Sequence, residues 1–449
     1  MSEQKTMKNG RQFSRREMLR GIGLGTAGVV LAACAPGGGS SGASSETSDG
    51  AAGGVTEVVW HCRTGANEQY YSAQVEDFHA SQDSVRVDIQ ATPNAEYQQK
   101  LATLAAAADL GDSYWANVFG QLYPFASAGI ALDVTDLIAA SDFSTDDFFD
   151  VGIQQISWEN KLLGLPAGGH PGWTTIYTNE DAFSAAGVDT PAWEWSYDKE
   201  FLENMQAVNE ANEDGTGRFA FLFDYAAQNC YTFIRSWGGD WVDADAKNST
   251  LLDEISLEAM KFIRDLVHEY KISPRQDQLV EQMFANDLAL TWNTGIWQYG
   301  RLGPVIEDKF TWRGYPSPAG PNGDRGSFIG CNTICINSSS DKADAAFAWG
   351  SWLVSPEVQL TVTADGQTPP FLKSAWDAPE LAEDPTLQAM RQWLEVATPW
   401  SVPANARALE FRNTFNQGLS AVFNGENDFM TEMENLHASI QGVLDKPTI

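Results

Sequence analysis

The chain has 449 residues, which is too long for one compact core, so it is expected to form two domains. Since 43% of its residues are hydrophobic, it can bury two cores. Its formal net charge is −32, from 28 Lys and Arg against 60 Asp and Glu. This charge argues against nucleic acid as a partner, because phosphates need a basic surface. It also disfavours anionic membranes and highly anionic ligands, unless a local basic pocket overrides the net field.

The first 33 residues have the features of an export signal. Arg15 and Arg16 precede an apolar run from 21 to 33, which is too short to span a bilayer of about 30 Å. The arginine pair resembles a twin-arginine signal, and Leu31-Ala-Ala-Cys34 resembles the lipobox of bacterial lipoproteins. We therefore expect residues 1–33 to be a signal peptide. The mature protein would be anchored by lipid on Cys34 to the outer face of the cytoplasmic membrane.

Residues 34–54 are expected to be a flexible tether. They are rich in Gly and Ser and cannot form a core, and their typical reach is about 25 Å. Within the preceding signal, residues 23–28 match the dinucleotide-binding pattern GxGxxG. No strand precedes this match, so we expect no cofactor.

Strands and helices alternate from Val55 onwards. Residues 55–61 and 85–89 are typical of strands, and residues 69–79 and 96–108 are typical of helices. The alternation predicts an α/β fold with parallel βαβ units. In such sheets ligands bind beyond the carboxyl ends of the strands.

Residues 159–181 are expected to carry the chain from one domain to the other. Leu162–Pro166 and Trp173–Tyr177 are typical of short strands, and the three glycines between them favour a bend. An ordinary hairpin rich in glycine and proline is an equally good interpretation of this stretch alone. Near the C-terminus, Thr431-Glu-Met-Glu434 predicts a capping box that begins the last helix.

Motifs around this stretch resemble those of extracellular solute-binding proteins of carbohydrate ABC importers (family 1), the branch similar to maltose-binding protein. Gly164-Leu-Pro and Ile176-Tyr-Thr-Asn-Glu-Asp match the family's first crossing between lobes. Residues 283–297 resemble the block that carries a ligand-stacking tryptophan, here Trp297. Residues 314–326 and 366–371 resemble the second and third crossings, and the resemblance extends from about residue 55 to the C-terminus.

The resemblance implies a two-lobed periplasmic-binding-protein fold, in which each lobe is a mostly parallel sheet flanked by helices and a multi-segment hinge joins them. The first lobe would comprise residues 55–167 and 325–370, and the second residues 168–324 and 371–449. It also implies a monomeric receptor, not an enzyme. Such a receptor captures a mono- or oligosaccharide between its lobes and delivers it to the transmembrane subunits of a permease.

Sugars have apolar faces and a rim of hydroxyls, so a receptor needs flat aromatic rings and planar polar side chains. The aromatic candidates, for which packing in a core is the alternative, are Trp173, Trp237, Trp241, Trp297 and Trp400. The polar candidates lie in loops expected to face the cleft, although solvation alone also explains each, and are Arg63, Glu68, Asn117, His170, Asp240, Asn332 and Arg407.

Two other functions remain open from the sequence. A secreted glycoside hydrolase or lyase would need two carboxylates about 5 to 9 Å apart across the cleft, and the chain has many acidic residues but no hydrolase motif. A receptor of the same fold for a cation such as a polyamine is suggested by the acidity.

Neither a metal site nor a disulfide is expected. Asp243, Asp245 and Glu254 are spaced somewhat like a calcium loop, but the required glycine is absent. After the lipidated cysteine, four cysteines remain, and buried free thiols are the default interpretation, with a Cys62–Cys331 pair as the alternative.

Overall fold

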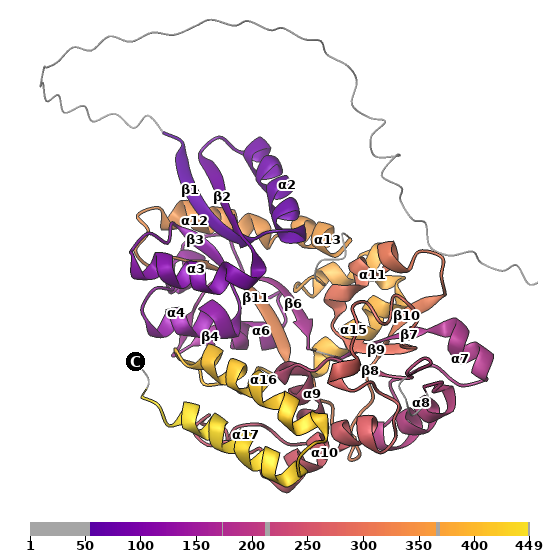
Figure 1. Ribbon diagram of the computed structural model, residues 1–449. Helices are drawn as coiled ribbons and strands as arrows, with labels where there is room; N and C mark the ends of the chain where they lie inside the picture. The colour runs from indigo at the N-terminus through magenta and orange to yellow at the C-terminus, as the bar shows by residue number, and fades with distance from the viewer. Residues whose placement is uncertain (1–53, 173, 212–215, 365–368, 448–449) are drawn as a thin grey trace, which may run out of the picture. The chain divides into compact units, whose positions relative to one another are not determined.

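The computed structural model describes residues 54–172, 174–211, 216–364 and 369–447, which belong to one compact unit. Figure 1 shows the order and arrangement of its helices and strands. The predicted signal peptide, Cys34, almost all of the tether and Trp173 lie outside the described residues. None of the helices in these ranges has the length and apolar composition needed to cross a membrane.

Five strands form the first sheet, in the order β2-β1-β3-β11-β6 (Figure 1). Their bounds are β1 Thr56–Arg63, β2 Val85–Thr92, β3 Ser113–Ala116, β6 Leu165–Pro171 and β11 Ile329–Ile336. β1 pairs in parallel with β2 and β3, whereas β11 runs antiparallel to β3 and β6. The predicted α/β class and the parallel units at the start of the chain are confirmed.

Helices from both ends of the chain cover the first sheet. They are α2 Ala66–Ser81, α3 Asn94–Ala106, α12 Ala343–Leu353 and α13 Pro356–Ala364. Trp60 of β1 is fully buried, with its ring centroid 5.6 Å from that of Tyr71 on α2 and 6.3 Å from that of Trp349 on α12. Such aromatic contacts bury a large apolar area and fix helices from distant parts of the chain on one sheet.

The second sheet has the strand order β10-β7-β9-β8. Its strands are β7 Thr175–Asn179, β8 Leu222–Phe223, β9 Thr291–Thr294 and β10 Trp312–Pro316. β7 pairs antiparallel with β9 and β10, and β8 pairs in parallel with β9. Two of its three strand pairings are antiparallel, so the expectation that each lobe has a mostly parallel sheet is wrong for this sheet.

Helices of the second half pack around this sheet and extend to the first. The larger ones are α7 Glu180–Ala186, α8 Leu202–Val208, α9 Ala227–Ser236, α10 Glu254–His268, α11 Tyr299–Ile306, α15 Pro385–Val396, α16 Ala408–Asn424 and α17 Phe429–Leu444. Shorter elements are η1 Val118–Leu122, α4 Tyr123–Ser127, α5 Thr135–Ala139, α6 Asp150–Gln155, β4 Ser157–Trp158, β5 Lys161–Leu162, η2 Tyr197–Phe201, η3 Gln276–Gln278, η4 Ile296–Gln298, η5 Ser374–Asp377 and α14 Pro379–Ala382. α16 contacts α9 and α10 as well as η1, which follows a strand of the first sheet.

The stretch expected to bend between two short strands is mostly strand. β6 continues to Pro171 and pairs with β11, so the chain leaves the first sheet there and enters the second at Thr175. The main role of the glycines here is to allow close packing against aromatic rings, and not to form a turn. A Cβ atom at Gly169 would lie 1.9 Å from the Phe371 ring, and one at Gly172 would lie 1.9 Å from the Phe328 ring.

All four cysteines among the described residues are buried free thiols: Cys62, Cys230, Cys331 and Cys335. The default interpretation of the sequence is confirmed, and the alternative Cys62–Cys331 pair does not form.

We expect Gly169→Ala to lower the free energy of unfolding by about 1–3 kcal/mol, because the added methyl group overlaps a buried phenyl ring. Chemical denaturation followed by tryptophan fluorescence would measure this change. Gly442→Ala is the matched control, because nothing lies within 4 Å of its Cβ position on α17. The control should be neutral or stabilising by up to about 1 kcal/mol. Equal stability of both variants would contradict this account of the crossing.

Candidate functional site

An aromatic contact joins the two sheets at the place where the chain crosses between them. His170 lies on β6 of the first sheet, and Trp297 lies on η4, just after β9 of the second. Their ring centroids are 5.0 Å apart with an interplanar angle of 64°, and the Trp297 side chain is partly exposed. A glycine packs against each ring. A Cβ atom built on Gly330 would lie 2.5 Å from the His170 ring, and one built on Gly295 would lie 1.8 Å from the Trp297 ring. We call this contact the junction.

Arg63 occupies the carboxyl end of β1, next to the junction. Its guanidinium carbon lies 3.7 Å from the centroid of the Trp115 ring, and its Nη1 donates a hydrogen bond of 3.2 Å to Asn94 Oδ1. Burial lowers the pKa of Arg63, and the positive charge of Arg301 on α11 adds to this effect. Burial is the larger cause, and the repulsion by Arg301 is a smaller one.

His170 is a neutral side chain at pH 7. Burial lowers its pKa to about 4, and the charge of Arg63 acts in the same direction. Its Nδ1 lies 3.3 Å from the carbonyl oxygen of Pro171. A neutral imidazole has one N–H donor and one acceptor nitrogen. Beside the Trp297 indole, it offers hydrogen bonds without charge.

Three other predicted polar residues lie on elements of the first sheet. Asn117 follows β3, and its Oδ1 accepts hydrogen bonds from the backbone N–H groups of Phe119 and Gly120 at 3.1 and 2.9 Å. Asn332 is on β11 beside the register shift in its pairing with β6, and Glu68 is in the first turn of α2. All three side chains are partly exposed.

Trp400 belongs to a second group of aromatic rings. Its ring stacks on Tyr231 of α9, with centroids 5.3 Å apart and an interplanar angle of 10°, and it meets Phe119 of η1 edge-on at 4.9 Å. Its backbone N–H donates a 2.6 Å hydrogen bond to Gln155 Oε1. Trp400 therefore connects elements that follow the first sheet to a helix packed on the second. It is only 8% exposed.

Asp240 and Trp241 both form hydrogen bonds with Ser401, the residue after Trp400. Trp241 is fully buried, stacks on Tyr231 at 4.2 Å, and donates its indole N–H to the Ser401 carbonyl oxygen. The Asp240 carboxylate accepts hydrogen bonds from Arg235 at 2.8 Å and from the Ser401 hydroxyl at 2.7 Å. The expectation that these two side chains contact a ligand does not fit, because both are occupied by the protein.

Trp237 and Arg407 do not reach the junction either. Trp237 is 5% exposed and packs against Tyr197 and Phe262, with ring centroids at 5.9 and 5.0 Å. It was expected in the site because it follows a helix rich in aromatic residues, but that helix turns these rings into the core. Arg407 pairs with Glu410 at 3.1 Å before α16.

The sequence interpretation missed residues that complete the junction. Trp115 of β3 was not among the aromatic candidates, yet its ring covers the Arg63 guanidinium. Arg301 could have been found, because it follows Trp297 by four residues, about one helical turn, on the adjoining helix. Asn94 gave no signal, since its contact with Arg63 depends on the pairing of β1 with β2.

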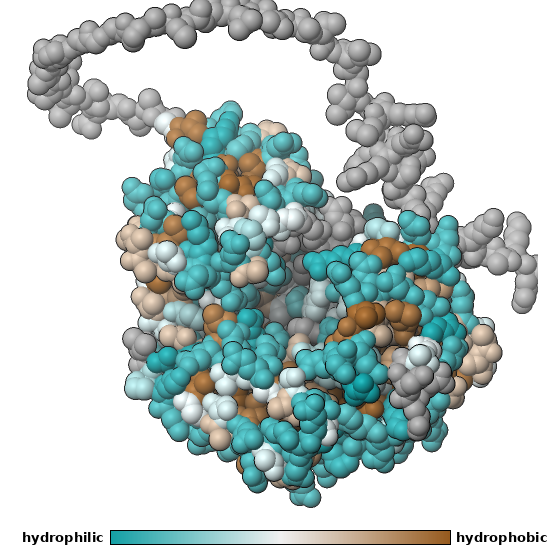
Figure 2. Space-filling model, in the orientation of Figure 1, coloured by the Kyte–Doolittle hydropathy of each residue, from teal (hydrophilic) through white to brown (hydrophobic). Residues whose placement is uncertain are grey.

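One cavity lies in the second half of the chain. It has a volume of about 420 Å³ and is lined by Asp224 after β8, by Trp292 of β9, and by Gln298 and Arg301. Gln298 directly follows Trp297 in the chain. In the space-filling view, the surface is hollowed in the middle of the face drawn (Figure 2). A cavity of this size holds a ligand of a few rings at most.

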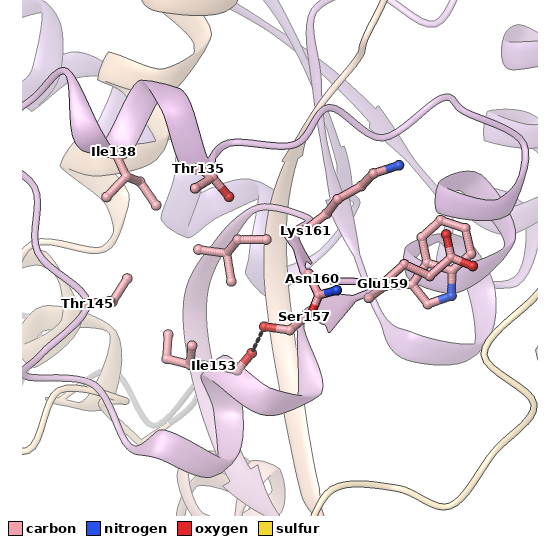
Figure 3. A pocket seen from close by; sticks show the side chains of 10 residues that line it. Thr135, Ile138, Thr145, Ile153, Ser157, Glu159, Asn160 and Lys161 are labelled. Atoms are coloured by element: carbon pink, nitrogen blue, oxygen red, sulfur yellow. Dashed lines mark hydrogen bonds between the residues drawn. The ribbon is translucent and has the colours of Figure 1, made fainter. Parts of the chain in front are cut away.

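A second cavity lies apart from the predicted site residues. It has a volume of about 560 Å³ and lies between α5, α6 and the hairpin of β4 and β5 (Figure 3). Ser157 donates a 2.6 Å hydrogen bond to the Ile153 carbonyl oxygen at its edge. Its lining residues are Thr135, Ile138, Thr145, Ile153, Ser157, Trp158, Glu159, Asn160, Lys161 and Leu162.

In the described part of the chain, no group of His, Cys, Asp and Glu side chains could hold a metal ion. Asp243, which begins the stretch spaced like a calcium loop, instead accepts hydrogen bonds from the backbone N–H groups of Lys247 and Asn248 at 2.7 and 3.1 Å. Its carboxylate closes a turn.

Comparison with known proteins gives the family. A family model described as bacterial extracellular solute-binding protein matches residues 73–389, and the chain belongs to this family. A probable amino-acid ABC transporter periplasmic-binding protein of Sinorhizobium fredii, y4oP, is 25% identical over 321 residues, which cover 67% of this chain and 69% of that protein.

Solved structures show the same fold. The substrate-binding protein Lmo0181 of Listeria monocytogenes, in complex with cycloalternan, has a TM-score of 0.76 and 19% identity, covering 87% of this chain and 99% of that one. The sugar-binding protein MalE of Xanthomonas citri has a TM-score of 0.75 and 20% identity, covering 87% and 97%. The chain thus has the two-lobed fold of ABC-importer receptors. It is an exported solute-binding protein, and its family and these structures are binding proteins.

We expect the buried neutral His170 to make the protein less stable in acid. Its pKa is about 4 in the folded state against about 6.5 when unfolded, so the unfolded state binds more protons between these values. Its contribution is complete above about pH 6.5 and is lost as the pH falls towards 4, by at most about 1.4 kcal/mol per pH unit. Melting temperatures of the wild type and His170→Gln from pH 4 to 8 measure this loss. Identical pH profiles would contradict the assignment.

Proposed function

We propose that this solute-binding protein is the carbohydrate receptor of an ABC importer. The observation that carries the proposal is the junction, where the partly exposed Trp297 ring meets the neutral His170 ring at 5.0 Å. An indole face suits the apolar face of a sugar ring, and an imidazole suits its hydroxyls. The cavity lined by Gln298, the next residue in the chain after Trp297, has room for one or two sugar rings.

Ligand capture in this proposal is closure of two lobes. The first lobe comprises residues 55–171 with 325–370 and the second residues 174–324 with 371–449, because β6 stays in the first sheet up to Pro171, beyond the boundary predicted at residue 167. His170 and Trp297 come from elements of different sheets, so a sugar that contacts both rings holds both sheets together. Such a ligand stabilises the closed state because it contacts both lobes only there. The closed monomer then docks on the transmembrane subunits of the permease.

Catalysis is not part of the proposal. A glycoside hydrolase needs two carboxylates about 5 to 9 Å apart around the bond that is cleaved. Among the predicted site residues, only Glu68 and Asp240 are acidic, and the Asp240 carboxylate is held by Arg235 and Ser401. These two residues therefore do not supply the pair.

We expect a glycan panel to identify a saccharide that raises the melting temperature, by an amount that grows with ln(1 + [L]/Kd). Trp297→Ala should then weaken its Kd roughly ten- to hundred-fold, since the stacking surface is lost. Trp352→Ala is the control, because that tryptophan is also partly exposed but packs on Phe78 of α2. Calorimetric titration of the three proteins measures Kd.

Other outcomes of the same screen would refute the proposal. The panel includes amino acids, because the name of the relative y4oP refers to amino acids, and a polyamine. Stabilisation by amino acids or by the polyamine alone, or release of products from an oligosaccharide, would exclude a carbohydrate receptor. An unchanged Kd in Trp297→Ala would remove the junction from the site.

The proposal includes a lipid anchor on Cys34, after cleavage of the signal at residue 33. We expect the wild-type protein to fractionate with membranes and to incorporate labelled palmitate in a bacterial host. Cys34→Ser should do neither and should appear in the soluble fraction. Ser45→Ala, in the same predicted tether, should behave as the wild type. Membrane retention of Cys34→Ser without label would contradict the anchor.

A further inference from the structure

We infer that the ligand carries an anionic group, a carboxylate or a phosphate, which binds Arg63. The inference rests on the proposed carbohydrate receptor and specifies its ligand as an acidic saccharide, such as a uronate or a sugar phosphate. Three observations support it: the partial burial of Arg63, its missing acidic partner, and the positive charge of Arg301, which lines the 420 Å³ cavity.

Arg63 is a partly buried cation without a matching anion among the described residues. Its Nε is buried and has no hydrogen-bond partner among the described residues. Its contacts are the Trp115 ring at 3.7 Å and Asn94 Oδ1 at 3.2 Å, and both partners are neutral. In the described part of the chain, no carboxylate lies within 4.0 Å of it. Desolvation of an unpaired guanidinium is costly, because arginine stays protonated.

The missing partner is notable in a chain with 60 acidic and 28 basic residues. Some other partly buried arginines have acidic partners, whereas Arg264, Arg325 and Arg412 have none among the described residues. Arg235 pairs with Asp240 at 2.8 Å, and Arg218 pairs with both Glu210 and Asp287 at 2.5 and 3.0 Å. Glu68 is the nearest predicted site acid in sequence, yet it forms no ion pair with Arg63. An anion supplied by the ligand would give Arg63 the kind of partner that Arg235 and Arg218 have within the protein.

Arg301 brings a second positive charge to the same place from the other sheet. It is exposed, lines the 420 Å³ cavity and lowers the pKa of Arg63 through its charge. The acid in that cavity, Asp224, accepts hydrogen bonds from Trp292 Nε1 at 3.0 Å and from Thr294 Oγ1 at 2.8 Å. An anion near Arg63 and Arg301 would remove the repulsion between them. It would therefore favour the closed state.

The geometry also suits a planar acid. The Trp115 ring covers one face of the Arg63 guanidinium, which leaves its edge for hydrogen bonds in the plane. A carboxylate or phosphate binds to such an edge through two parallel hydrogen bonds. The sugar ring attached to this group would then lie towards Trp297. A local pair of arginines overrides the repulsion expected from the net charge, because electrostatic effects at short range depend on the nearest groups.

Calorimetric titration with matched saccharides tests the inference. The probes are oligogalacturonides, galacto-oligosaccharides of the same length, glucose 6-phosphate, glucose and glutamate. We expect an acidic saccharide to bind at least about tenfold more tightly than its neutral counterpart. This difference in affinity should shrink as the salt concentration rises from about 20 to about 500 mM, because salt screens the attraction between the two charges. Galacturonides and the sugar phosphate distinguish a carboxylate from a phosphate.

Variants of Arg63 locate the charge. We expect Arg63→Gln to weaken acidic saccharide binding roughly ten- to hundred-fold, and Arg63→Lys to weaken it less. Neutral saccharide binding should change little. Arg86→Gln is the matched control, because Arg86 lies near the opposite end of the same sheet and pairs with Asp83. The melting temperature of ligand-free Arg63→Gln should not fall, since a buried unpaired charge is removed, and this checks that the variant folds.

The outcomes separate the two proposals. If neutral saccharides bind as tightly as acidic ones, and Arg63→Gln leaves both unchanged, the anionic ligand is refuted while the carbohydrate receptor stands. If no saccharide binds and glutamate does, the carbohydrate receptor is refuted, and the acidic saccharide with it.

Discussion

The pairing of β11 with β3 and β6 is the constraint on which the rest of the structure depends. This strand inserts antiparallel between two strands that precede it by more than a hundred residues, so the first sheet closes only after the chain has visited the second. The fit is tight, because a Cβ at Gly164 would lie 2.3 Å from the Ile334 carbonyl oxygen. β11 also carries Gly330, which faces the His170 ring. The position of the junction therefore follows from backbone hydrogen bonds that side chains cannot replace.

The tryptophans differ in burial according to where their helices and strands lie. Trp60, Trp241 and Trp349 are fully buried and fix helices on sheets or on one another. Trp297 is different, because its ring rests on Gly295 and keeps one side partly open. Trp400 lies between these extremes, held by Tyr231 behind it and Phe119 beside it. Most tryptophans of this fold thus pack its core, and the same helices and strands also hold Trp297 and Trp400 where the two sheets meet.

Much of the first lobe could be predicted from the sequence, because its strands and helices alternate with clear periodicity and pair locally. The crossing was placed correctly near His170, but its glycines were read as a bend, since their contacts with Phe328 and Phe371 arise only in the folded chain. The last helix begins at Phe429 with Asp428 as its cap, one turn before the predicted capping box, because both residues suit a cap and only the backbone decides.

The effect of Arg301 on Arg63 could not be predicted from the sequence, because it depends on how the two sheets are arranged. Composition gave the sign of the charge over the whole chain, and from this sign we expected an anionic ligand to be disfavoured. Net charge governs solubility and long-range attraction, whereas a site responds to groups within a few ångströms. At the junction these groups are two arginines, a neutral histidine and an indole. A strongly acidic protein can therefore hold an acid, provided that the fold leaves a cation such as Arg63 at the site without a carboxylate partner of its own.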